Sequence, residues 1–234
     1  MSLTIAWNNI FKLFRKNSLI FLSCLFPSNL LLILLNNEVR SMVNVPIMEA
    51  FSKGNVPLLP LLEVTERPFD LLPLLASIWL LLNYAFGFPI LLALDRPKSL
   101  KRALVKFAIK IPKLFVFTLA VGFLIYLGLL AVLVPGIMIA LGFSLLIPTI
   151  MLENIPFRKI FVRTLELSQR KLRKLFILLS PWVLTYIFIP SLFSPILTTN
   201  SLLTLFSLSI VVTFTNSLLV SALASAYIMC TNNY

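Results

Sequence analysis

Residues 113–176 read KLFVFTLAVGFLIYLGLLAVLVPGIMIALGFSLLIPTIMLENIPFRKIFVRTLELSQRKLRKLF. No charged residue occurs from residue 114 to residue 152, and Pro135-Gly136 interrupts this stretch near its middle. About 20 apolar residues are enough to cross a bilayer as a helix. The stretch therefore predicts two membrane-spanning helices, 114–134 and 136–152, followed by a basic amphipathic segment, 153–174. Proline cannot continue a helix and glycine tolerates unusual dihedral angles, so Pro135-Gly136 is interpreted as a chain turn rather than a gating hinge.

The composition of the whole chain points to the same environment. Of its 234 residues, 59% are hydrophobic and only 12% are charged, with a mean hydropathy of +1.01. A soluble domain is closer to half apolar and a quarter charged. One aqueous core cannot bury this much apolar surface, so lipid must surround the chain. We expect an integral membrane protein.

The same pattern repeats on both sides of the opening stretch. Residues 1–16 alternate apolar and basic positions with a helical period, which predicts an interfacial helix. The polar connection 38–70 contains four prolines and is predicted to be an external loop. We expect a single all-α membrane domain, 1–234, with interfacial amphipathic helices before the first, third and fifth of six transmembrane helices. These spans are placed at about 17–37, 71–94, 114–134, 136–152, 175–196 and 201–229.

The basic residues predict the orientation of these spans. With six spans, all but three of the 20 basic residues fall on one side, in the amino-terminal helix and in the segments 95–113 and 153–174. The other side holds Arg40, Lys53 and Arg67 together with five acidic residues. Basic residues near span ends mark the cytoplasmic side of a membrane. Both termini are therefore predicted to be cytoplasmic.

Three parts of the sequence resemble a known family. They are the opening MSLTIAWNNIFKLFRK, the stretch 111–152 around Val134-Pro135-Gly136-Ile137, and VRTLELSQRKLRKLF with Arg163-Thr164. Together they resemble the YciC family of uncharacterised multi-pass bacterial inner-membrane proteins. That family usually carries Arg-Ser where this chain has Arg163-Thr164, and threonine keeps the hydroxyl. The resemblance implies a bacterial inner-membrane location and no reaction.

The two basic segments are the candidate contact surface. Anionic headgroups attract lysine and arginine at the cytoplasmic surface of a membrane, either generally or at specific sites between spans, and the general attraction is the simpler interpretation. Nucleic acid is not expected as a partner, because Phe107, Phe157 and Phe161 fall on the apolar faces and could not stack on bases. The possible anionic-lipid contacts are Lys101, Arg102, Lys106, Lys159, Arg163, Arg170 and Lys174.

Acidic residues begin both basic segments. Asp95 and Glu153 could bind a cation or join a proton path, but a position near the start of a cytoplasmic helix, where the helix dipole favours a carboxylate, or pairing with a nearby base explains them more simply. Glu166 lies within about one turn of Arg163 and Arg170, a spacing that favours ion pairs. No span interior carries a charge, which counts against a proton-coupled transporter.

No catalytic or cofactor motif is visible. The chain has no histidine, no glycine-rich phosphate loop and no clustered metal ligands. We expect no enzyme, no catalytic residue, no cofactor and no metal. The favoured function is a membrane-organising or complex-supporting protein that contacts anionic lipid. The alternative is a transporter or channel for a small neutral or amphiphilic solute, with a polar cavity lined by residues such as Asn83 and Asn216.

Overall fold

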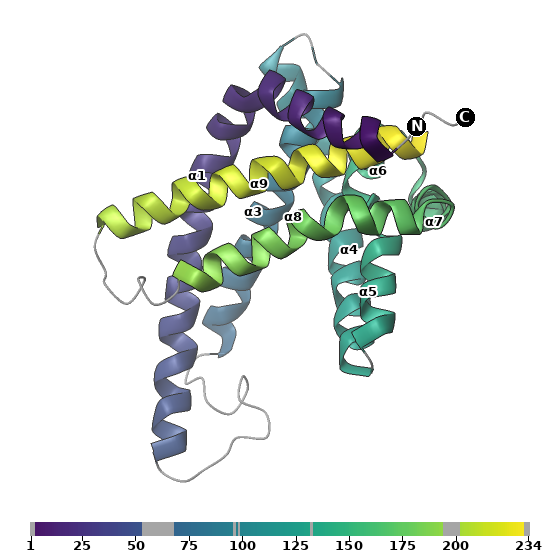
Figure 1. Ribbon diagram of the computed structural model, residues 1–234. Helices are drawn as coiled ribbons and strands as arrows, with labels where there is room; N and C mark the ends of the chain where they lie inside the picture. The colour runs from purple at the N-terminus through teal and green to yellow at the C-terminus, as the bar shows by residue number, and fades with distance from the viewer. Residues whose placement is uncertain are drawn as a thin grey trace.

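The described part of the chain is almost entirely helical (Figure 1). The computed structural model describes residues 3–52, 68–95, 97, 99–131, 133–193 and 202–231. Within these residues no strand occurs, so the all-α prediction is confirmed. The helices are α1 (Leu3–Ser52), α3 (Pro68–Asp95), α4 (Leu100–Ala131), α5 (Leu133–Gly142), α6 (Leu146–Leu152), η1 (Phe157–Lys159), α7 (Ile160–Gln169), α8 (Leu172–Phe193) and α9 (Leu202–Thr231).

Five helical segments of the described chain are long and apolar enough to cross a membrane. They are Leu3–Leu35, Leu75–Asp95, Leu100–Gly128, Val134–Leu152 and Leu205–Thr231. Large apolar side chains lie exposed on their outer faces, including Leu19, Phe123 and Met138. Such a surface is suited to lipid rather than water. Helix α8 covers much of the predicted span 175–196, whose end lies outside the described residues, so six crossings remain a prediction.

Helix α1 bends at Asn17, where φ is −116° and ψ is 15°. The Asn17 side chain donates to the Leu13 carbonyl oxygen, at 3.0 Å. The bend falls where the predicted interfacial helix meets the predicted first span. Beyond residue 37, however, α1 continues through Pro46 to Ser52. The loop prediction is therefore wrong for residues 38–52, where the one proline, Pro46, does not end the helix. Residues 53–67 lie outside the described chain.

The central hairpin differs from the prediction at two points. Helix α4 runs without interruption from the basic segment into the apolar stretch, so no separate surface helix precedes the third span. Helix α4 ends at Ala131 and α5 begins at Leu133, so Pro135-Gly136 belongs to the first turn of α5 and does not separate the two helices. Proline is favoured there because the first helical N–H groups have no partner inside the helix. Gly136 allows a close helix crossing, since a Cβ atom on Gly128 would lie 2.9 Å from the Gly136 Cα atom.

The predicted fourth span is a broken helix. Helix α5 ends at Gly142, a turn follows, and α6 begins at Leu146. The Ser144 hydroxyl donates to the Leu141 carbonyl oxygen at 2.8 Å, within this turn. Helix α6 ends at Glu153, whose backbone is extended (φ −94°, ψ 144°). An extended link then leads through Pro156 into η1 and α7, so the basic segment 153–174 does contain a helix set apart from α8.

Helix α9 packs along α1 and beside α8 (Figure 1). Its face toward α1 carries small polar residues at every fourth position, and all of them are buried: Ser209, Thr213, Ser217, Ser221 and Ser225. Small side chains allow helix backbones in a membrane to approach closely. The Ser225 hydroxyl donates to the Ala6 carbonyl oxygen at 2.8 Å, which holds the carboxyl-terminal part of α9 against the start of α1.

Candidate functional site

Four segments distant in sequence meet at one end of the molecule. Tyr227 of α9 contacts Glu153, at the end of α6, and Lys110 of α4 contacts the carbonyl oxygen of the same residue. Lys171, between α7 and α8, donates to the Met229 carbonyl oxygen at 2.6 Å. With the Ser225–Ala6 bond, these contacts gather the amino-terminal helix, both basic segments and the end of α9. This arrangement agrees with the charge count, which assigns the four segments to one side.

Glu153 is the centre of the polar contacts at this end. One carboxylate oxygen, Oε2, accepts from Arg163 Nε at 3.1 Å, and the other, Oε1, accepts from the Tyr227 hydroxyl at 2.8 Å. Arg163 also lies 3.9 Å from the carboxylate of Glu166. The Glu153 side chain is 21% exposed, so water partly screens the pair. Asp95 pairs with Lys106 at 2.8 Å. The pairing interpretation of both acids is confirmed, whereas the helix-start interpretation is wrong, because Asp95 is the last residue of α3 and Glu153 directly follows the last residue of α6.

Lys110 stabilises the carboxyl end of α6. Its ammonium donates to the Met151 carbonyl oxygen at 2.7 Å and to the Glu153 carbonyl oxygen at 3.3 Å. The last carbonyl groups of a helix lack partners within the helix and carry partial negative charge, so a cation is favourable there. Lys110 is only 8% exposed. Among the described residues, no carboxylate forms an ion pair with the Lys110 ammonium group.

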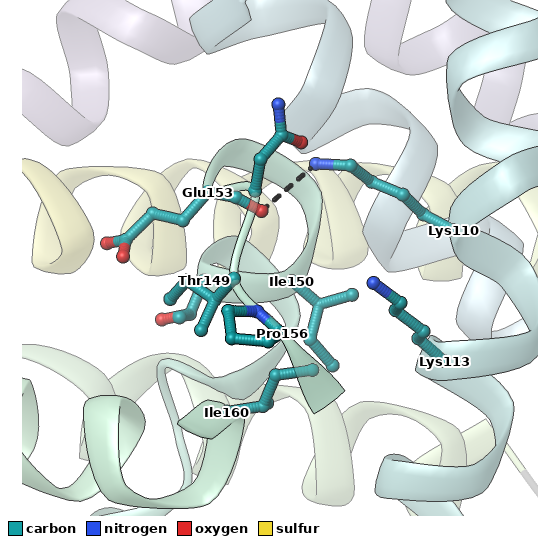
Figure 2. Close-up of a pocket in the computed structure, with 9 residues that line it drawn as sticks. Lys110, Lys113, Thr149, Ile150, Glu153, Pro156 and Ile160 are labelled. Carbon is teal, nitrogen blue, oxygen red and sulfur yellow. Dashed lines mark hydrogen bonds between the residues drawn. The ribbon is translucent and has the colours of Figure 1, made fainter. Parts of the chain in front are cut away.

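A cavity of about 450 Å³ lies beside this contact, between α4, α6 and the link to α7 (Figure 2). Figure 2 shows Lys110 and Lys113 on one wall, with the Glu153 carboxylate turned away from both ammonium groups. Thr149 lines the cavity too. It is 1% exposed, and its hydroxyl has no hydrogen-bond partner among the described residues. The complete lining is Lys110, Lys113, Thr149, Ile150, Glu153, Asn154, Ile155, Pro156 and Ile160.

The predicted lipid contacts divide into two groups. Lys106 and Arg163 are half-buried and belong to the ion pairs with Asp95 and Glu153. The remaining five are exposed, on α4 and around α7: Lys101, Arg102, Lys159, Arg170 and Lys174. Among the residues of the family resemblance, Arg163 lies at the Glu153 site, and the hydroxyl of buried Thr164 donates to Ile160 within α7. Pro135 and Gly136 lie in the first turn of α5, away from this site.

The sequence analysis missed four residues of this region: Lys110, Lys113 and Thr149 as cavity residues, and Tyr227 as a partner of Glu153. One feature of the sequence could have identified Lys110 and Lys113. They are the last basic residues before the uncharged part of α4, a position from which a lysine side chain can extend back toward the membrane surface. No local pattern could have paired Tyr227 with a residue far earlier in the chain.

Interior polar residues connect α1 to α9 and α3 to α4. The Asn29 amide of α1 donates to the Thr213 hydroxyl at 3.1 Å, and the Asn216 amide donates to Asn29 Oδ1 at 2.8 Å. Thr118 accepts from the indole N–H of Trp79, which joins α4 to α3. Asn83, Thr185 and Thr149 do not bridge helices in this way: the first two donate to carbonyl groups of their own helices.

Comparisons with known proteins assign neither a family nor a function to this chain. No family model, curated protein or solved structure matches this chain. The resemblance to the YciC family therefore stays a prediction. The described residues also contain no group of three or more cysteine, aspartate or glutamate side chains placed to hold a metal ion.

Proposed function

We propose that this chain is a non-enzymatic, multi-pass protein of the bacterial inner membrane that supports membrane organisation or a partner complex by contacting anionic lipid. The proposal includes six spans, cytoplasmic termini and membership of the YciC family. One observation carries it: exposed cations and exposed apolar side chains alternate on the same surface of α4. Lys101 and Arg102 are exposed beside Leu100, Leu104 and Ile109, and Ile109 is 71% exposed.

That combination suits the headgroup region of a membrane. Apolar side chains gain free energy in the acyl region, and nearby ammonium and guanidinium groups meet lipid phosphates. The surface around α7 has the same character, with exposed Val162 near Lys159 and Phe157. Each exposed base near an anionic surface contributes roughly 1 kcal/mol, so several together produce a measurable preference.

The transporter alternative receives less support. Asn83 and Asn216, the proposed lining of a polar path, are both buried and already bonded to protein groups. Asn216 is held between α9 and α1, whereas Asn83 lines an apolar cavity of about 300 Å³ between α3 and α4. These two environments do not form the polar cavity that this alternative requires.

Lipid analysis of the full chain tests the proposal. The chain is extracted from bacterial membranes with a polymer that retains surrounding lipid, and the anionic fraction of that lipid is compared with the bulk membrane. We expect enrichment of anionic lipid around the wild-type chain. Replacing Lys101, Arg102, Lys159 and Lys174 with glutamine should abolish the enrichment, whereas replacing Arg40, Lys53 and Arg67 should leave it intact. A wild-type chain with the bulk lipid composition would refute the proposal.

A further inference from the structure

The cavity beside Lys110 has an unbalanced positive charge. Lys110 and Lys113 are three residues apart on α4, a spacing that puts both side chains on one face. Glu153 supplies only its backbone carbonyl to this wall, because its carboxylate is bound to Arg163 and Tyr227. In the described part of the chain, Lys113 has no hydrogen-bond or ion-pair partner. A cavity with two ammonium groups and no carboxylate in reach favours an anion.

Hydrogen-bond donors remain available in the cavity. An ammonium group has three N–H bonds, and Lys110 uses two of them on the carbonyl oxygens of Met151 and Glu153. Lys113 retains all three. A tetrahedral anion with several acceptor oxygens would bind the remaining N–H groups of both lysines together.

The other walls of the cavity are apolar. Ile150, Ile155 and Ile160 line it, and exposed Asn154 and Pro156 lie at its rim. The uncharged part of α4 begins directly after Lys113 and exposes Val116 and Leu119. A ligand in this cavity therefore meets cations at one side and continuous apolar surface at the other. A free inorganic anion would make no use of the apolar side, whereas a lipid would use both.

We propose that this cavity is a specific site for the phosphate group of one anionic phospholipid, bound by Lys113 and Lys110. The inference rests on the proposed contact with anionic lipid and narrows it to a single site. The exposed lysines attract anionic headgroups non-specifically, whereas the cavity binds the headgroup phosphate of a single lipid molecule. The bound phosphate also lies next to the Lys110 contact, so lipid occupancy supports the end of α6.

Native mass spectrometry of the full chain in mild detergent tests this site. The chain is titrated with phosphatidylglycerol, phosphatidylcholine or diacylglycerol, and the Kd of the first bound lipid is measured. We expect phosphatidylglycerol to bind most tightly, because choline neutralises its own phosphate and diacylglycerol has none. Lys113→Gln should weaken the first phosphatidylglycerol by about tenfold or more, since it removes a charged hydrogen bond. Thr149→Val, which keeps the side-chain shape, should leave it unchanged, because the Thr149 hydroxyl points away from both ammonium groups (Figure 2).

Lys16→Gln is the matched control, because this exposed lysine of α1 has the same charge, lies outside the cavity lining and is not among the predicted lipid contacts. Its effect should stay below twofold. If Lys113→Gln and Lys16→Gln weaken binding equally, the specific site is refuted while general lipid contact survives. If phosphatidylglycerol binds no better than phosphatidylcholine to the wild type, the proposed function fails as well. Displacement of the lipid by millimolar inorganic phosphate would assign the cavity to a soluble anion and refute the lipid source.

Discussion

Removal of the Glu153 side chain is the perturbation with the most sharply defined consequence. Glu153→Ala separates α6 from both α7 and α9, because Arg163 and Tyr227 lose their shared acceptor. Glu153→Gln keeps an acceptor for Arg163 and a polar partner for Tyr227 but removes the negative charge. The two substitutions together distinguish the hydrogen bonds from the charge.

The expected magnitude follows from the two bonds. A hydrogen bond to a charged group contributes about 1.5–3 kcal/mol, and the partial exposure of Glu153 and Arg163 favours the lower limit. Two bonds of about 1.5 kcal/mol give a loss of about 3 kcal/mol for Glu153→Ala. The loss for Glu153→Gln should be roughly half as large. For a chain of this length, 1 kcal/mol shifts the unfolding midpoint by about 2–4 °C, so we expect decreases of about 6–12 °C and 3–6 °C.

A buried native cysteine, Cys230, can report thermal unfolding in this measurement. Cys230 is 4% exposed in the native structure, so a thiol-reactive fluorophore labels it when the surrounding helices separate. Replacing Cys24, the other cysteine, with serine leaves one reporting thiol. Thermal unfolding of the purified chain in mild detergent then gives the midpoint for each variant.

Two results would contradict this reasoning. A decrease below about 2 °C for Glu153→Ala would show that the three side chains do not stabilise the fold. Tyr227→Phe supplies the second test, because it should cost clearly less in the Glu153→Ala background than in the wild type. An equal cost in both backgrounds would mean that Tyr227 and Glu153 are not coupled.

The helix contacts elsewhere give two further predictions. Gly128→Ala should lower the unfolding midpoint far more than Gly142→Ala, because the new methyl group would meet the Gly136 backbone at 2.9 Å in the first case and a movable leucine side chain at 3.3 Å in the second; equal midpoints would show that α4 and α5 separate without cost. Asn29→Leu should cost about 0.6–2 kcal/mol in the same assay, since it leaves the buried Asn216 amide without its acceptor, and an unchanged midpoint would show that this bond contributes nothing.

Much of the architecture could be predicted because the membrane simplifies the sequence pattern. Uncharged stretches of sufficient length must be helical in lipid, so helix was correctly predicted for most of the uncharged residues that the structure describes. Ion pairing of Glu153 was also predictable from the nearby bases. The positions at which helices break or continue were not predictable, because they depend on packing between helices. The sequence could not show that α1 continues past Pro46, or that α4 continues from the basic segment into the apolar stretch.

The position of the hairpin turn shows the same limit. Proline and glycine together suggest a turn, but both also suit the first turn of a helix that crosses another closely. Which of the two roles Pro135-Gly136 takes depends on Gly128 of α4, because the Gly136 backbone packs directly against Gly128. The cavity residues were missed for a related reason. Lys113 and Thr149 belong to different helices, and only the broken fourth span brings the end of α6 beside α4.

The contact between Asn29 and α9 has a consequence for how the protein is made. Asn29 enters the membrane early in synthesis, but its partners Thr213 and Asn216 are 184 and 187 residues further along. At roughly 5–20 residues per second, the ribosome needs about 10–40 s to produce them. During that interval a polar amide stays in lipid without its native partners. Synthesis of this protein therefore passes through an intermediate in which α9 is not yet inserted. In that intermediate the insertion machinery or α3 must cover the Asn29 amide of α1.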